Sequence, residues 1–225
     1  MSRITGVLYL LLAVFSGLPF LLLTERVMVT GDAVATTRNL LANETLARVG
    51  FVGEILGLTC WVLLGVAFYR LLAHVGKWVA GVMVLFVGTG AAIMGAALIN
   101  YFAALLVAMD GSYAAGLGQV GSETLVLLFL NLRVNGYLVA QVFFGLWLLP
   151  LGYLAYKSGR FPKALAVLLV VGCAGYIVDM LARFLVPDIA PTIAPFAIIP
   201  ATVAEFWMVG YLLVKSPARF RVAIA

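Results

Sequence analysis

Charged side chains are scarce in this chain. Asp, Glu, Lys and Arg make up 10% of its 225 residues, whereas 65% are hydrophobic. Soluble domains contain about 25% charged and about 45–50% apolar residues, so this composition excludes an ordinary soluble protein. It predicts an integral membrane protein whose main partner is the lipid bilayer. The net charge of +5 lies mostly in short loops between apolar runs, so it indicates membrane topology, and no nucleic-acid partner is expected.

Histidine and cysteine are also rare. The single histidine, His74, falls in a loop. A bis-histidine haem site, a histidine-rich zinc site and a Ser-His hydrolase within the membrane each need a histidine at depth, so all three are excluded. Cys60 and Cys173 lie in the middle of apolar runs, where we expect reduced packing residues and no disulfide framework. The sequence therefore predicts no cofactor and no metal site.

Long apolar runs are abundant. A hydrocarbon core of about 30 Å is crossed by about 20 helical residues. The runs predict six transmembrane helices at approximately 4–24, 49–70, 78–109, 125–156, 164–186 and 196–214. The predicted fold class is all-α: a polytopic integral membrane protein forming one six-helix bundle, with residues 1–225 as a single domain. Asp32 is expected to cap a short helix in the first loop and Pro150 to kink the fourth span, and residues 110–123 and 187–195 are expected to be loops.

The loops differ in positive charge, which predicts the orientation. Nine basic residues fall on the side of the two termini: Arg3, Arg70, Lys77, Lys157, Arg160, Lys163, Lys215, Arg219 and Arg221. Four fall on the other side: Arg26, Arg38, Arg48 and Arg183. Because short cytoplasmic loops carry the excess of Lys and Arg, both termini are predicted to be cytoplasmic, in the cell's cytoplasmic membrane.

Several ionisable side chains nevertheless lie inside the spans. A charge at membrane depth is costly by several kcal/mol and normally faces a protein interior or a water-filled cavity. Helix rise and the predicted orientation place four of these charges, on four helices, in the outer half of the membrane. The candidates for a ligand or ion pocket are Glu54, Asn100, Asn131, Arg133, Tyr176, Asp179, Arg183 and Glu205.

Pairing among these charges is also expected. Arg133 should contact at least one of the three acids, Glu54, Asp179 and Glu205, because an uncompensated buried charge costs several kcal/mol. Asp179 and Arg183 stand at i,i+4, so they share a helix face and can pair locally.

Three functions fit this pattern. The first is binding or transport of a small molecule, a lipid or a proton through an outward-facing polar pocket within the membrane. The second is a structural or sensory membrane protein in which the buried charges only hold the helices together. The third is an intramembrane enzyme that uses paired carboxylates, which the residues favour least. No residue is singled out as catalytic, and no pattern fixes an oligomeric state.

Two segments carry a resemblance to a known family. The first runs Phe-Phe-Gly-Leu-Trp-Leu-Leu-Pro-Leu-Gly-Tyr-Leu-Ala-Tyr-Lys-Ser-Gly-Arg-Phe-Pro-Lys from Phe143, and the second is Gly-Tyr-Ile-Val-Asp at 175–179. Together with Gly31-Asp32-Ala33, Thr36 and Glu205, they resemble the bacterial membrane-protein family of unknown function DUF4386. The resemblance covers nearly the whole chain. It implies a six-helix integral membrane protein and no established substrate.

Overall fold

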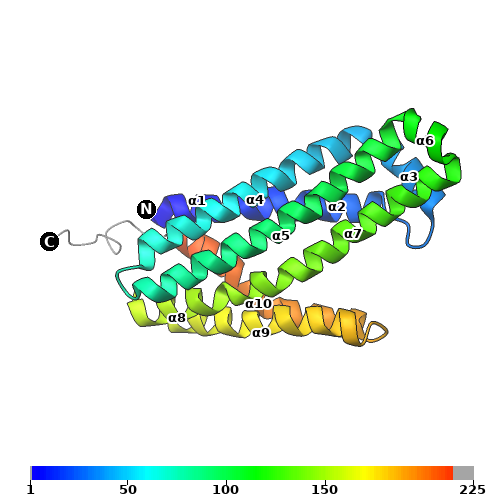
Figure 1. Ribbon diagram of the computed structural model, residues 1–225. Helices are drawn as coiled ribbons and strands as arrows, with labels where there is room; N and C mark the ends of the chain where they lie inside the picture. Colours follow the sequence, from blue (N-terminus) through cyan, green and yellow to red (C-terminus); the bar gives the residue numbers. More distant parts are fainter. Residues whose placement is uncertain (1, 215–225) are drawn as a thin grey trace. The chain divides into compact units, whose positions relative to one another are not determined.

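Helices account for all the regular structure in the computed structural model, which describes residues 2–214 (Figure 1). In chain order they are α1 (Ser2–Leu12), the π-helix η1 (Ala13–Gly17), α2 (Leu18–Arg26), α3 (Ala33–Ala42), α4 (Glu44–Leu72), α5 (Lys77–Met109), α6 (Gly111–Leu117), α7 (Gln119–Leu146), α8 (Leu148–Ser158), α9 (Lys163–Leu185) and α10 (Ala190–Val214).

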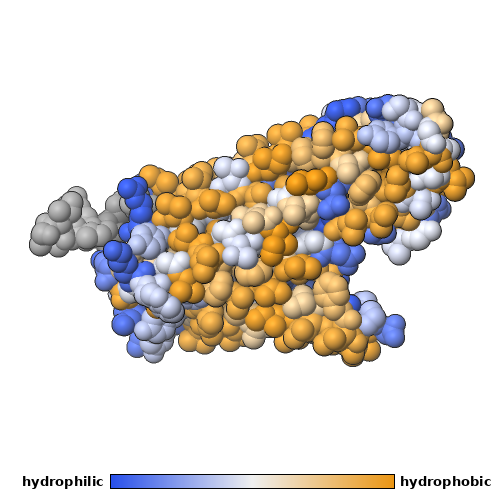
Figure 2. Space-filling model, viewed as in Figure 1, coloured by the Kyte–Doolittle hydropathy of each residue, from blue (hydrophilic) through white to orange (hydrophobic). Residues whose placement is uncertain are grey.

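Six helical stretches in the described residues are long and apolar enough to cross a membrane. They are Ser2–Arg26, Glu44–Leu72, Lys77–Met109, Gln119–Ser158, Lys163–Leu185 and Ala190–Val214. Hydrophobic side chains make up most of the face shown in Figure 2. The predicted all-α fold with six transmembrane helices is therefore confirmed.

Two compact units divide the chain. Of the described residues, the first contains 2–11, 60–91 and 138–214, and the second contains 12–59 and 92–137. Helices α4, α5 and α7 each contribute to both units. The single-domain organisation stays a prediction from the sequence.

The second unit has its own hydrophobic core. Tyr101 and Leu130 are fully buried there, together with Leu40 of the short helix α3. Asp32 caps α3 as predicted, because its Oδ1 accepts a hydrogen bond from the Ala35 backbone N–H at 2.8 Å. The cap supplies a partner for an otherwise free N–H and holds α3 over the core.

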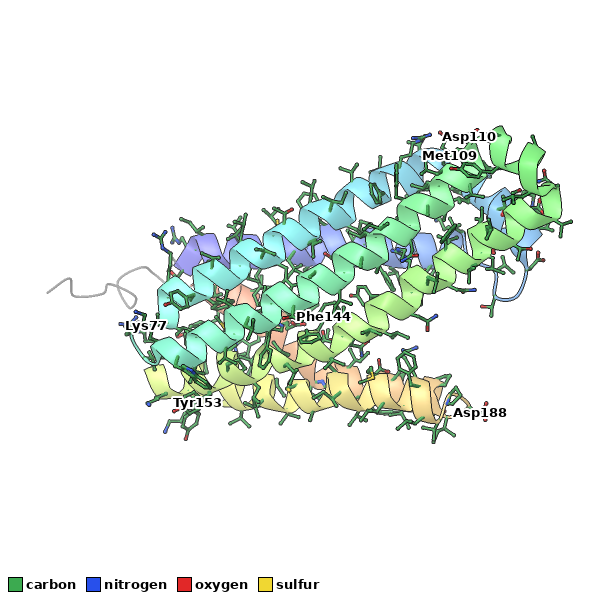
Figure 3. The ribbon with its side chains drawn as sticks, in the orientation of Figure 1. Lys77, Met109, Asp110, Phe144, Tyr153 and Asp188 are labelled. Atoms are coloured by element: carbon green, nitrogen blue, oxygen red, sulfur yellow. The ribbon has the colours of Figure 1, made fainter. Side chains whose placement is uncertain are left out.

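The core of the first unit is aromatic. Trp147 is 1% exposed, and its ring centroid lies 5.7 Å from that of Tyr9 and 6.1 Å from that of Phe68. Phe144 of α7, labelled in Figure 3, stacks edge-on against Trp61 and Tyr176, with ring centroids at 5.0 Å and 6.2 Å. These rings bring α1, α4, α7 and α9 together around Tyr9 and Tyr176.

Helices α9 and α10 lie side by side and pack closely (Figure 1). A Cβ added at Gly175 would lie 2.0 Å from the carbonyl oxygen of Ala197, and one added at Gly172 would lie 2.7 Å from the Cα of Ala201. Small residues allow this backbone approach, which is a common way for helices to associate in membranes.

The predicted bounds of two loops, 110–123 and 187–195, are wrong. Residues 110–123 contain the short helix α6 and the start of α7, since Asp110 caps α6 and Gly118, at φ 76°, forms the joint before α7. The backbone and side-chain hydrogen bonds of Ser112 lower the pKa of the exposed Asp110 carboxyl. Helix α10 begins at Ala190, six residues before the predicted start at 196. Pro191 is tolerated in the first turn of a helix, whereas Pro195 lies inside α10.

The fourth span is interrupted close to Pro150, where a kink was predicted. The helix is interrupted at Trp147, which separates α7 from α8. Pro150 has no N–H to donate to the carbonyl four residues earlier, and this missing bond accounts for the break.

The predicted orientation stays a prediction, and the basic tail residues Lys215, Arg219 and Arg221 that support it lie outside the described residues.

Labelling of introduced cysteines tests the orientation. His74 lies in the turn after α4, Gly116 lies in α6 after the end of α5, and both are exposed. In a chain with Cys60 and Cys173 replaced by alanine, we expect His74→Cys to be shielded from an impermeant thiol reagent in intact cells. Gly116→Cys should be labelled, because successive spans alternate in direction. The reverse pattern would place both termini outside.

Candidate functional site

Arg133 and Glu54 form an ion pair within the second unit. Nη2 of Arg133 donates to Oε1 of Glu54, and the two residues are 1% and 2% exposed. The prediction that Arg133 contacts one of the three acids is confirmed, and Glu54 is its partner. The attraction between the two buried charges offsets part of the free energy that it costs to remove them from water. Removing either partner would leave the other charge buried and uncompensated, which is strongly destabilising.

Two aromatic rings lie against the guanidinium of Arg133. Its Cζ lies 4.9 Å from the ring centroid of Phe20 and 4.8 Å from that of Tyr101. Tyr101 is fixed in turn, because its hydroxyl donates to the carbonyl of Ala47 at 2.8 Å. Within residues 2–214, Nε and Nη1 of Arg133 are buried and have no hydrogen-bond partner. Cation–π contacts and one carboxylate therefore stabilise the positive charge of Arg133.

The candidate asparagines do not join this pair. Asn100 donates to the carbonyl of Ala96, four residues earlier on its own helix, at 3.1 Å. Asn131 is exposed, and its backbone carbonyl accepts a bond from the side chain of Asn135. In the described part of the chain, neither shares a hydrogen bond with Glu54 or Arg133.

Asp179 is the second paired acid and belongs to the first unit. Its side chain is 1% exposed, and both of its oxygens accept from Nε of Arg183 at 3.1 Å. Gln141 of α7 donates to Oδ2 of Asp179 at 2.6 Å and to the carbonyl of Tyr176 at 3.3 Å. The expected i,i+4 pair is confirmed, and Gln141 adds a link from α7 to α9.

Glu205 is bound differently. Its Oε1 accepts from the hydroxyl of Tyr9 at 3.0 Å, and its Oε2 accepts from the hydroxyl of Tyr176 at 3.1 Å. Both donors are neutral, and Glu205 makes no ion pair among residues 2–214. It lies fifteen residues after Ala190 and nine before Val214. At 1.5 Å per residue these spacings are about 23 Å and about 14 Å, so Glu205 is deep in its span. Because α10 begins six residues earlier than predicted, Glu205 lies in the half that ends at Val214 and not at the midpoint.

Tyr176 connects the two acids of the first unit. Its hydroxyl binds Glu205, and its carbonyl accepts from Gln141, which binds Asp179. The result is a hydrogen-bonded chain from Tyr9 on α1 through α10, α9 and α7 to Arg183 at the end of α9. Within residues 2–214 no three His, Cys, Asp or Glu side chains gather in a way that could hold a metal ion.

Sequence reasoning missed Tyr9 and Gln141. Gln141 had a usable signal, because an amide inside an apolar span needs a hydrogen-bond partner just as a charge does. Tyr9 had none, since a tyrosine in an apolar run is most often a packing or interfacial residue.

Comparisons with known proteins identify a family and assign no activity. An uncharacterised protein of Archaeoglobus fulgidus is 38% identical over 71 residues, which are 32% of this chain and 43% of that relative. The chain thus spans less than half the length of that relative. No solved structure matches. The profile described as Domain of unknown function (DUF4386) matches residues 4–216, and the chain therefore belongs to this family.

Proposed function

We propose that the protein is a membrane-embedded binding or transport protein in which Glu205 accepts a proton or a cationic group of a ligand. The observation that carries this proposal is the environment of Glu205: two tyrosine hydroxyls, one on each oxygen, and no positive partner among the described residues. An ionised carboxylate without a counter-charge is costly at this depth. A proton or a bound cation removes that cost.

The other two acids differ from Glu205 in a way that supports the assignment. Glu54 and Asp179 each face an arginine, so each has its charge compensated inside the protein. A structural clamp accounts for them. It does not account for a carboxyl group held only by neutral donors, and such intramembrane residues are functional candidates by default.

The structural or sensory alternative has one specific observation in its favour. The Glu54–Arg133 pair is buried, and Arg133 lies against two aromatic rings, as expected of a residue pair that only holds helices together. If Glu205 is structural as well, replacing it should lower the stability of the protein. If it binds a proton or a cation, replacing it should abolish proton uptake and leave the stability almost unchanged.

Replacing Glu205 with glutamine tests the proposal. Glutamine keeps one oxygen that can accept from a tyrosine, so we expect the free energy of unfolding to fall by only about 1 kcal/mol. Proton uptake should be lost, because an amide does not titrate. The measurement uses vesicles that contain the purified protein and a trapped pH-sensitive dye, in which an imposed pH gradient should decay faster with the natural chain than with Glu205→Gln.

Glu44→Gln is the matched control. Glu44 is 49% exposed and pairs with Arg48 at 2.7 Å, so its loss should leave the decay of the gradient unchanged. If Glu205→Gln unfolds at a much lower temperature and carries protons as the natural chain does, Glu205 is structural and the proposal is wrong.

A further inference from the structure

A groove lies along α10 next to the end of α9, within the first unit. Its volume is about 440 Å³, and it is lined by Arg183, Ala194, Pro195, Ile198, Ile199, Thr202 and Val203. This volume is within the range of about 300–1,000 Å³ that ligand sites show. Ala194 is buried and forms the floor, whereas Pro195, Ile199, Thr202 and Val203 are exposed on a span that crosses the membrane. The groove therefore opens toward lipid.

The lining is apolar except at one end. Thr202 has a hydroxyl, but it donates to the carbonyl of Ile198 on its own helix at 3.1 Å. Arg183 is the charged lining residue, and its side chain is 39% exposed. From Ala194 to Val203 the groove follows nine residues of α10, or about 14 Å of helix. An extended hydrocarbon chain matches an apolar groove of this length with one cation at its end.

Arg183 is held in position and keeps donors available. Its Nε binds both oxygens of Asp179, which Gln141 fixes from α7. In the described part of the chain, the hydrogen bonds of Arg183 use Nε, which leaves the N–H groups of both terminal nitrogens. Guanidinium N–H groups bind phosphate oxygens in pairs, and a guanidinium that is already fixed loses little freedom on doing so.

The depth of Arg183 suits a lipid headgroup. Arg183 lies two residues before the end of α9, about 3 Å along the helix axis, so its guanidinium can reach the membrane surface. Asp188, labelled in Figure 3, is exposed in the turn that follows. Asp179 is already paired with Arg183, so Asp188 adds a further negative charge five residues after Arg183 in the chain. This charge balance favours a headgroup that carries an amine as well as a phosphate.

We propose that this groove binds a phospholipid with an amine-bearing headgroup, whose phosphate is held by Arg183 and whose acyl chain lies between Ala194 and Val203. This site is separate from Glu205 and does not depend on the function proposed for it. The lipid would cover the groove and add a contact at the turn between α9 and α10.

Lipid retention measured by native mass spectrometry tests the proposal. The purified chain is stripped of lipid and given phosphatidylethanolamine or phosphatidylglycerol with the same acyl chains. We expect the natural chain to retain phosphatidylethanolamine preferentially and Arg183→Gln to bind it about tenfold more weakly, since a hydrogen bond to a charged group contributes on that order. Thr202→Phe should weaken retention to a similar extent by filling the groove while leaving the Arg183–Asp179 pair in place.

Arg48→Gln is the matched control, because Arg48 also pairs through Nε with an acid four residues earlier on its helix, and it is 61% exposed. Its lipid retention should equal that of the natural chain. Unchanged retention in both Arg183→Gln and Thr202→Phe, an equal loss in Arg48→Gln, or equal retention of the two lipids by the natural chain would each overturn the proposal.

Discussion

Replacing Glu54 with leucine should lower the free energy of unfolding by about 3–5 kcal/mol. The substitution removes the carboxylate that Arg133 binds and leaves a guanidinium that is 1% exposed. Phe20 and Tyr101 remain in contact with it, but cation–π contacts contribute only about 1–2 kcal/mol. Nε and Nη1 of Arg133 already lack partners among the described residues, so the stranded charge has no second acceptor there.

Denaturant titration in detergent, with a double-mutant cycle, separates the pair from its surroundings. Glu54→Leu combined with Arg133→Met should recover most of the lost stability, because a buried ion pair replaced by apolar residues of similar volume is often neutral. Glu44→Gln, which breaks the exposed Glu44–Arg48 pair, should cost less than about 1 kcal/mol. A double variant as unstable as Glu54→Leu alone would show that the loss does not come from the uncompensated charge.

Replacing Gly175 with alanine should be the second large effect, with a loss of about 3 kcal/mol or more in the free energy of unfolding. The new Cβ would lie 2.0 Å from the carbonyl oxygen of Ala197. That oxygen belongs to the backbone of α10, so it cannot turn aside as a flexible side chain can. Helices α9 and α10 would have to separate, and the bond from Tyr176 to Glu205 would be stretched with them.

Gly210→Ala is the matched control on the same pair of helices. A Cβ at Gly210 meets no atom within 4 Å, so alanine there should leave stability unchanged or raise it by up to about 1 kcal/mol through helix propensity. Thermal unfolding of the two purified variants gives the comparison. Equal melting temperatures for Gly175→Ala and Gly210→Ala would mean that the close approach of α9 and α10 does not stabilise the protein.

The six transmembrane helices could be predicted from the sequence because their cause is local. A long uncharged run must satisfy its backbone hydrogen bonds within itself once it is in lipid, and an α-helix does so regardless of its neighbours. The cap at Asp32 and the pair between Asp179 and Arg183 are local for the same reason, since each joins residues three or four positions apart. The errors in α6 and at the start of α10 arose where glycine and proline gave the signal of a loop but were compatible with a helix end.

The sequence alone also determined that Arg133 needs an acid, because a buried charge without compensation is too costly. Which acid it binds was decided by tertiary structure, and so was the contrast between Glu205 and the two paired acids. Those outcomes depend on how each helix is rotated about its axis and how closely its neighbours approach. Contacts far apart in the chain set both, such as Gly175 against Ala197 and the rings of Tyr9 and Tyr176 around Trp147 and Phe144. No local pattern encodes these contacts, since each arises only when helices from distant parts of the sequence pack together.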